Sequence, residues 1–339
     1  MKKLKSNNLM QYKLSPLKPL AGFFMPRILP PTLHNAVVFE LRGGLADQIR
    51  IICFAKWLHD SWQGEKPEII FNIWRTLGSY GIGTTPVAYD DPELQTLLKS
   101  RKRSYDASGK KLASQAFELC GYDMDWSWTK GFITMSRKMI TRYELFGRRY
   151  KIYRASKFIE IISKRKIKLP SYIRSFPDFE MFESPIAAGF LKSLTAKMKE
   201  DNRFKLAEIK ETQNSICVHI RRGDYIAHYD GLSLPAEYFE KAIAKIITQT
   251  RWESVTLFVF SDDWEWAEQA INFSFSGVDL KIDFVRLNDI SEPIPELELM
   301  RSCKHFVISA GNFARMAAEM AINEEKIMIM PIRSNFVKE

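Results

Sequence analysis

The chain has 339 residues, of which 46% are hydrophobic and 13% aromatic, and its formal net charge is +10. This length and composition allow a large buried core, which excludes a disordered protein and favours two domains. The four cysteines lie far apart in apolar contexts, without the spacing of a metal site, and therefore predict buried thiols in a reducing compartment.

Residues 1–35 form a basic leader that contains no acidic residue. No long apolar core follows its first lysines, and prolines interrupt it, so the leader matches neither a secretory signal nor a membrane-spanning helix. No run of about 18 apolar residues occurs elsewhere in the sequence. We therefore expect a cytoplasmic protein, with any membrane contact peripheral and on the inner face of the cytoplasmic membrane.

A strand, a glycine turn and a helix are predicted next. The apolar stretch 36–41 predicts the strand, and residues 49–58 predict an apolar helix. Gly43 and Gly44 lie between them, where they let the turn tighten and bring backbone amides toward a ligand above the sheet. The alternative is an ordinary tight turn, since many strand-to-helix connections use glycine.

The middle of the chain is less regular. A second strand is predicted at 68–73, whereas residues 75–211 show no clear alternation. Within 130–174, basic residues are interleaved with apolar ones, which predicts an amphipathic surface that could rest on an anionic membrane leaflet or hold an anionic acceptor. The charge could also attract nucleic acid, although no nucleic-acid-binding motif accompanies it. The plain alternative is a helical segment whose basic side is solvated.

Strand-like and helix-like segments alternate through the last third of the chain. Such alternation predicts a parallel sheet with helices on both faces. The strands are expected at 215–220, 255–260, 280–287, 305–309 and 326–330, and the helices at 235–248, from about 264, at 295–303 and at 312–322. The polar residues Ser261, Asp262 and Asp263 precede the second of these helices and can cap it.

Two adjacent arginines follow the strand 215–220. Arg221 and Arg222 leave its carboxyl end, which is the edge where open α/β sheets bind ligands. Arginine presents a planar fork of donors that can hold two phosphate oxygens, and it stays charged at any working pH. The pattern predicts an anionic ligand, against the alternative of a surface turn with an Arg222–Asp224 ion pair. The loop at Asp262 and the turn at 309–312 should reach the same edge.

Five segments along the chain carry a resemblance to a known family. They are G-G-L-A-D-Q at 43–48, H-I-R-R-G-D-Y at 219–225, L-P-A-E-Y-F-E-K-A at 234–242, F-S-D-D-W-E-W at 260–266 and E-L-E-L-M-R-S-C-K-H at 296–305. In composition and in order, these segments resemble the motifs of glycosyltransferase family 11, the α-1,2-fucosyltransferases.

The resemblance implies two Rossmann-like domains of the glycosyltransferase B type. It implies that residues 36–211 bind the acceptor and that residues 212–339 bind a GDP-sugar. The implied reaction is inverting transfer of L-fucose from GDP-fucose to the 2-hydroxyl of a terminal β-galactoside, in surface glycan synthesis. The donor-binding residues that it implies are Gly43, Gly44, His219, Arg221, Arg222, Ser261, Asp262 and Asn312.

The implied partners are a GDP-sugar and a galactose-containing oligosaccharide, with a lipid-linked oligosaccharide as one option and no nucleic acid. Two alternatives stay open. One is a transferase that uses another GDP-sugar, and the other is a non-catalytic descendant that binds a nucleotide or a glycan.

The expected catalytic residues follow from the chemistry of transfer. Departure of GDP leaves charge on its β-phosphate, which Arg221 and nearby helix-start amides could stabilise, so no metal or other cofactor would be required. The alternative is a metal at D-M-D, 123–125, which spells the D-x-D of metal-dependent glycosyltransferases. The acceptor hydroxyl must also lose a proton, and the candidate bases are Asp224, His228 and Asp230.

The chain departs from the family pattern near its end. Where family members have hydroxyl-bearing residues and two tryptophans, this chain has Gly311, Asn312, Arg315 and Met316. These changes bear on the sugar half of the donor and on the acceptor more than on the diphosphate half.

Overall fold

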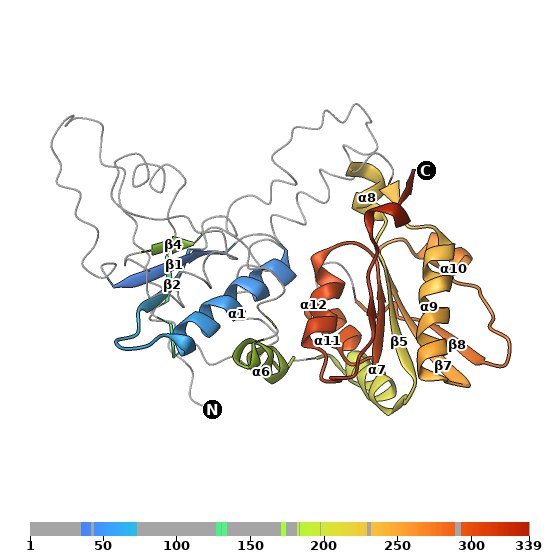
Figure 1. Cartoon of the computed structure of the whole chain (residues 1–339), viewed down its shortest axis with the longest axis horizontal. Helices are drawn as coiled ribbons and strands as arrows, with labels where there is room; N and C mark the ends of the chain where they lie inside the picture. Colours follow the sequence, from blue (N-terminus) through green and yellow to red (C-terminus); the bar gives the residue numbers. More distant parts are fainter. Residues whose placement is uncertain are drawn as a thin grey trace. The chain divides into compact units, whose positions relative to one another are not determined.

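The computed structural model describes residues 35–41, 44–72, 127–129, 131–133, 171–173, 182, 184–196, 198–228, 232–288 and 293–338. The chain divides into two compact units, the second of which begins its main segment at Leu191 (Figure 1). This division lies before the expected boundary at 211/212, so helix α7 (Glu200–Glu211) belongs to the second unit.

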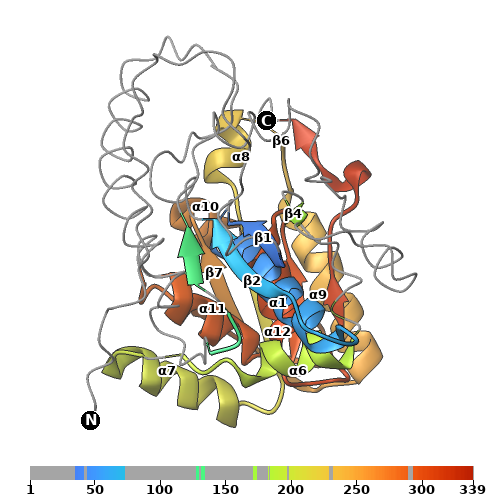
Figure 2. The same cartoon turned by 90° about the vertical axis from the view of Figure 1, so that its left-hand side faces the viewer.

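A four-stranded parallel sheet organises the first unit. Its strands are β1 (Ala36–Glu40), β2 (Glu68–Asn72), β3 (Gly131–Ile133) and β4 (Ser171–Ile173), in the order β3-β2-β1-β4. Helix α1 (Leu45–Ser61) lies along this sheet (Figure 2), and Phe54 of the helix packs edge-on against Phe39 of β1, with 5.8 Å between ring centroids. The two predicted strands are confirmed. The helix begins earlier than expected, because Leu45 and Ala46 are buried as well.

A five-stranded parallel sheet organises the second unit. Its strands are β5 (Ser215–Ile220), β7 (Ser254–Ser261), β8 (Asp279–Phe284), β9 (His305–Ile308) and β10 (Met328–Ile329), in the order β10-β9-β5-β7-β8. Between successive strands lie the helices α9 (Ala236–Thr250), α10 (Trp264–Ala270), α11 (Pro293–Arg301) and α12 (Asn312–Met320). The predicted alternation of strands and helices is therefore confirmed.

Both sheets follow the same winding order. In each, the first strand along the chain lies inside the sheet, the second and third extend to one side, and the fourth lies on the other side. This is the order of doubly wound Rossmann-like sheets. The expected α/β class with two Rossmann-like domains, as in the glycosyltransferase B type, is confirmed. In such sheets the ligand crevice lies where the order reverses, which is between β1 and β4 in one unit and between β5 and β9 in the other.

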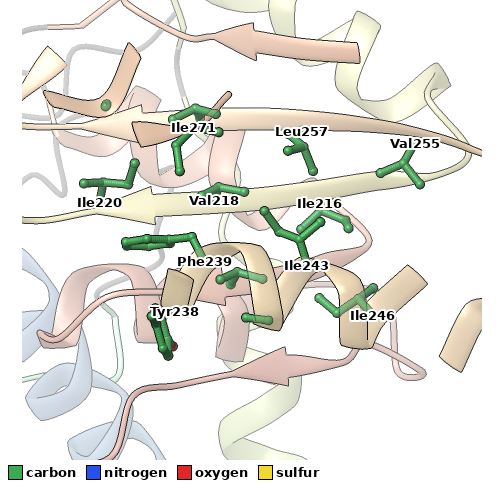
Figure 3. Packing of buried hydrophobic residues seen from close by; sticks show 14 of the residues in the cluster. Ile216, Val218, Ile220, Tyr238, Phe239, Ile243, Ile246, Val255, Leu257 and Ile271 are labelled. Carbon is green, nitrogen blue, oxygen red and sulfur yellow. The ribbon is translucent and has the colours of Figure 1, made fainter. Parts of the chain in front are cut away.

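Helix α9 covers one face of the second sheet (Figure 3). Alternate side chains of β5, among them Ile216 and Val218, point toward the helix and meet Phe239 and Ile243, all at most 1% exposed. Each such side chain stabilises the fold by about 1.5–3 kcal/mol. Because side chains alternate along a strand, His219 lies on the opposite face of the sheet, away from α9.

Several shorter elements complete the described structure. They are α6 (Pro185–Ser193), α8 (Gly223–His228), the antiparallel pair β6 (Leu232–Ser233) and β11 (Val337–Lys338), and the 3-10 helix η3 (Arg333–Asn335). The three cysteines within the described ranges, Cys53, Cys217 and Cys303, are buried free thiols, as predicted. None of the helices described is long and apolar enough to span a bilayer.

Candidate functional site

Three loops meet at the carboxyl edge of the second sheet. Strand β5 pairs in parallel with β7 on one side and with β9 on the other, so Arg221, Asp262 and Ser309 leave the sheet side by side. Backbone hydrogen bonds continue past the strand ends, since the N–H of Asp262 donates to Ile220 O at 3.4 Å and the N–H of Ser309 donates to His219 O at 3.0 Å. The edge expected from the sequence is thus present, at the point where the strand order reverses.

Asp262 fixes the turn that contains the two arginines. Its Oδ1 accepts a hydrogen bond from the N–H of Arg222 at 2.8 Å, and its Oδ2 accepts one from the N–H of Gly223 at 3.2 Å. A Cβ on residue 223 would lie 3.2 Å from Oδ2, so this close approach favours glycine. The carboxylate that shapes the turn is therefore Asp262, 40 residues away from Arg222 in the chain.

Arg222 lies buried beneath the turn. It is 5% exposed, its Nε donates to Asp263 Oδ2 at 3.1 Å, and its guanidinium carbon lies 4.1 Å from the ring centroid of Trp266. An ion pair together with a cation–π contact holds a guanidinium firmly in a partly dry site. These contacts give Arg222 a structural role in the turn.

Hydrogen bonds of its own side chains fix the loop after β7. The Oδ1 of Asp263 accepts a hydrogen bond from the N–H of Trp266 at 3.2 Å, which caps α10. The hydroxyl of Ser261 accepts the N–H of Asp263 at 2.9 Å. The predicted cap of this helix is confirmed, and the cap residue is Asp263.

Arg221 lies at the switch point of the second sheet, between the carboxyl ends of β5 and β9. Its side chain is partly exposed and runs beside Gly311, because a Cβ at residue 311 would lie 3.6 Å from Arg221 Cδ and 3.9 Å from its Nη1. Gly311 has φ +111°, a conformation that other residues rarely adopt, and it immediately precedes α12, which starts at the exposed residue Asn312. The charge of Arg221 and the amide dipoles at the start of α12 therefore favour an anion at the same place.

His219 lies beside these groups in a neutral form. Its Nδ1 is 2.9 Å from Ser309 Oγ, and it is 7% exposed. Burial and the nearby charge of Arg221 lower the pKa of His219 to about 3. A neutral His219 cannot supply a proton in a reaction near neutral pH, and it leaves the positive charge at this edge to Arg221.

Glu296 is a titratable group of this edge, and its role was not predicted from the sequence, where it begins the segment E-L-E-L-M-R-S-C-K-H. Burial, and then the negative charge of Asp262, raise the pKa of Glu296 to about 7. The residue lies in the first turn of α11, next to the buried Leu297. An acidic residue set directly into an apolar helix face is the sequence signal that could have singled it out.

The other predicted residues are described only in part. The backbones of Asp224 and His228 lie in α8, but their side chains, like Gly43, Asp230, the segment 123–125 and most of 130–174, lie outside the described residues. Gly44 precedes α1 with φ −68°, and a Cβ there would meet nothing within 4 Å, so its backbone does not require glycine. Among the residues with described positions, no group of three or more His, Cys, Asp and Glu side chains could hold a metal.

Comparison with known proteins gives the family of this chain. The model of glycosyl transferase family 11 matches residues 134–339, which include all three loops of the edge described above. The chain belongs to glycosyl transferase family 11. The resemblance found in the sequence is confirmed, while the glycine turn at 43–48 lies outside the matched segment.

Two bacterial relatives of this family 11 chain come from Escherichia coli. An α-1,2-colitosyltransferase is 29% identical over 129 residues, which cover 38% of this chain and 43% of the relative. The O-antigen biosynthesis glycosyltransferase WbnK is 33% identical over 128 residues, which cover 36% and 40%. The matches thus span about two fifths of the length of these relatives. Among solved structures, fucosyltransferase NodZ from Bradyrhizobium aligns at 11% identity with a TM-score of 0.48, covering 90% of this chain and 99% of NodZ.

Replacing Asp262 with alanine should loosen the arginine turn of this family 11 chain. The amides of Arg222 and Gly223 would lose their acceptor, and water would replace it only in part. For GDP, the ligand proposed below, we expect about tenfold weaker binding, which corresponds to about 1.4 kcal/mol, in a calorimetric titration. The control is Glu265→Ala, which removes an exposed carboxylate from α10. Equal GDP affinity in both variants would contradict the role given to Asp262.

Two groups of this edge should affect stability in opposite directions as the pH falls from about 6.5 to 4.5. The pKa of His219 lies near 3 in the folded chain against 6.5 in the unfolded chain. As the pH falls, His219 is protonated in the unfolded chain but not in the folded chain, which lowers stability. The pKa of Glu296 lies near 7 in the folded chain against 4.5 in the unfolded chain. Its carboxyl group is therefore protonated in the folded chain at a pH where it is still ionised in the unfolded chain, so stability rises as the pH falls. In the unchanged chain these two contributions offset each other within this window.

Single variants should reveal each contribution. Glu296→Gln should make the free energy of unfolding fall by up to about 1.4 kcal/mol per pH unit, and His219→Gln should make it rise by a similar amount, as the pH is lowered. Urea unfolding at several pH values measures both slopes relative to the unchanged chain, so that other titrating groups cancel. Identical slopes in all three proteins would show that the two groups do not titrate as described.

Proposed function

We propose that this chain is an inverting glycosyltransferase that moves L-fucose from GDP-fucose to the 2-hydroxyl of a terminal β-galactoside in surface glycan synthesis. The observation that carries the proposal is the position of Arg221, which lies at the switch point of a Rossmann-like sheet beside the start of α12. The names of the two bacterial relatives support α-1,2 transfer and a role in O-antigen synthesis. The colitosyltransferase among them keeps a donor other than GDP-fucose as the alternative.

Arg221 would act on the leaving group of the reaction. When the bond between the sugar and GDP breaks, negative charge develops on the β-phosphate. A guanidinium can donate two parallel hydrogen bonds to phosphate oxygens, and the amide dipoles at the start of α12 add to the same field. Interactions that strengthen as the charge develops lower the barrier. Because protein groups supply this positive charge, we propose that transfer requires no metal.

The loops around Arg221 would hold it in place for this role. Asp262 accepts hydrogen bonds from two backbone amides of the turn, and the ion pair between Arg222 and Asp263 links the same turn to the start of α10. Such a rigid support reduces the reorganisation that stabilising the phosphate would otherwise need. We therefore infer that Asp262, Arg222 and Asp263 are positioning residues for Arg221.

A group other than Arg221 would remove the proton from the acceptor hydroxyl. The acceptor hydroxyl attacks the anomeric carbon from the face opposite the diphosphate, which inverts the configuration, and its proton passes to a base. Asp224 and His228 remain candidates because α8 begins in the turn that Asp262 fixes, and Asp230 follows this helix in the sequence.

The test is product analysis of the purified chain with GDP-fucose and lactose in the presence of EDTA. We expect an α-1,2-linked fucosyl product with inverted configuration, identified by NMR. If a product forms only from another GDP-sugar, that sugar nucleotide is the donor in place of GDP-fucose. A requirement for added Mg²⁺ or Mn²⁺ would overturn metal-independent transfer. GDP binding without transfer to any galactoside would favour the non-catalytic alternative.

A further inference from the structure

A concave site lies at the amino edge of the second sheet, opposite the edge that carries Arg221. It has a volume of about 320 Å³, and its lining includes residues that lie one or two positions before four strands: Gln213 before β5, Trp252 before β7, Lys304 before β9 and Ile327 before β10. This volume lies in the lower part of the range of small-molecule sites, about 300–1,000 Å³. At about 3.3 Å per residue, β5 separates the two edges by roughly 20 Å.

An aromatic surface lines part of this pocket. The rings of Trp252 and His305 lie 4.8 Å apart between centroids, with an interplanar angle of 36°. The Nδ1 of His305 accepts a hydrogen bond from the N–H of Ile327 at 2.9 Å, so the neutral ring carries its hydrogen on Nε2. Burial lowers the pKa of His305, which keeps the ring neutral near pH 7. The pocket therefore contains an indole surface and a neutral imidazole.

Exposed or half-exposed polar side chains surround the aromatic surface. No side-chain hydrogen bond or ion pair of Gln213, Lys304 or Glu325 occurs within the part of the chain that the structure describes. The loop that carries Glu325 is fixed, because Asn323 donates to Lys304 O at 3.0 Å and accepts the N–H of Glu325 at 3.1 Å. An amide, an ammonium and a carboxylate thus lie around one opening, on backbone that is fixed at Lys304 and Glu325, and each can bind a ligand.

This set of groups selects the chemistry of the ligand. An anion would be attracted by Lys304 but repelled by Glu325, and a cation would be attracted by Glu325 but repelled by Lys304. A purely apolar ligand would cover these polar groups without satisfying them, which is costly. A hydroxyl group both donates and accepts, so several hydroxyls on one ring can satisfy the amide, the ammonium and the carboxylate together. The apolar face of such a ring can pack on an aromatic side chain.

We propose that this pocket binds a neutral sugar ring of a glycan, with the ring face on Trp252 and its hydroxyls bonded to Gln213, Lys304 and Glu325. The pocket lies too far from Arg221 for the same sugar ring to reach both, so the sugar held here is a distant part of an acceptor or a separate chain. The inference rests on the chemistry of the pocket, and it deepens the proposed function by assigning a second glycan-binding site.

Saturation-transfer NMR and calorimetry of the full chain with methyl β-D-glucopyranoside and cellobiose, neutral sugars without galactose that are not acceptors in the proposed reaction, test this proposal. We expect weak binding, with a Kd of about 1 mM. The affinity should be at least tenfold lower in the double variant Gln213→Ala/Glu325→Ala. The matched control is Gln249→Ala/Glu240→Ala, which removes an amide and a carboxylate from the exposed side of α9 and should leave binding unchanged. Trp252→Phe should also weaken binding while conserving most of the core contact of Trp252.

The outcomes separate this site from the donor site. The Arg221→Ala variant should bind the sugars as the unchanged chain does, and the Gln213→Ala/Glu325→Ala variant should bind GDP as the unchanged chain does. Sugar binding that is equal in the pocket and control variants would overturn the proposal, as would the absence of binding by either sugar. Stronger binding of a zwitterion such as glycine than of the sugars would also overturn it.

Discussion

Replacing Arg221 with alanine should lower kcat/KM for sugar transfer by about a hundredfold to a thousandfold, the size expected when one stabiliser of a developing oxyanion is lost. Arg221 lies between β5 and β9 with its side chain against Gly311, so no other described arginine of this edge has the same position, and Arg222 is occupied beneath the turn. Because His219 is neutral, it cannot replace the lost charge. Steady-state kinetics with GDP-fucose and lactose measures the effect.

Two further variants separate charge from geometry at this position. Arg221→Lys keeps the charge but loses the planar fork, so we expect an intermediate loss in kcat/KM. Arg203→Ala removes an exposed arginine from α7, whose Nε donates to the nearby carbonyl of Met198, and should leave kcat/KM unchanged. A loss of kcat/KM in Arg221→Ala no larger than in Arg203→Ala would refute the role of Arg221.

Replacing Arg301 with methionine should lower the free energy of unfolding by about 3–5 kcal/mol, the cost typical of breaking a buried ion pair from one side. Arg301 and Glu298 are both 6% exposed, Nη2 donates to Glu298 Oε1 at 2.9 Å, and Nε lies 2.8 Å from Oε2 as an ion pair. Arg301 also donates to the carbonyls of Leu191 and Leu194. Without this arginine, the buried carboxylate of Glu298 and the carbonyl of Leu194 lose their donor, and Leu191 O keeps only the N–H of Leu194 at 3.3 Å among the described donors.

Urea unfolding measures this effect, and a double variant checks its cause. Arg301→Met/Glu298→Leu removes both charges, so it should be less destabilising than Arg301→Met alone. A double variant that is at least as unstable as the single one would show that the packing of the arginine stem matters more than the charges. Arg203→Ala again serves as the exposed control, with an expected change within about 0.5 kcal/mol.

The sequence predicted the strands and helices of the second sheet well, because the central strands β5, β7 and β9 are largely apolar and buried. Strand β5 was predicted at its observed bounds, and α9 follows Pro235, as the position of this proline indicated. Helix α7 was missed because it is polar, with only Asn202 and Ile209 buried. Contacts with distant residues stabilise it, such as the ion pair between Lys205 and Asp283 at 2.9 Å. Such contacts leave no periodic pattern in the sequence.

The roles of individual site residues were harder to predict than their location. The sequence placed Arg221 and Asp262 at one edge, because parallel strands end together there. It could not separate the two arginines, since the contact of Arg222 with Trp266 and its pair with Asp263 depend on how the loop after β7 folds. The sequence predicted no helix directly after Arg222, whereas Gly223–His228 form α8, and Asp262 accepts the N–H of Gly223 where this helix begins.

The central claim is that the edge around Arg221 binds the diphosphate of a GDP-sugar. The most direct measurement is calorimetric titration of the full chain with GDP and GDP-fucose in EDTA, beside the Arg221→Ala variant. We predict that the chain binds both ligands and that the variant binds them at least about tenfold more weakly, a loss of at least about 1.4 kcal/mol. Absence of GDP binding by the unchanged chain, or equal affinity in the variant, would contradict the claim.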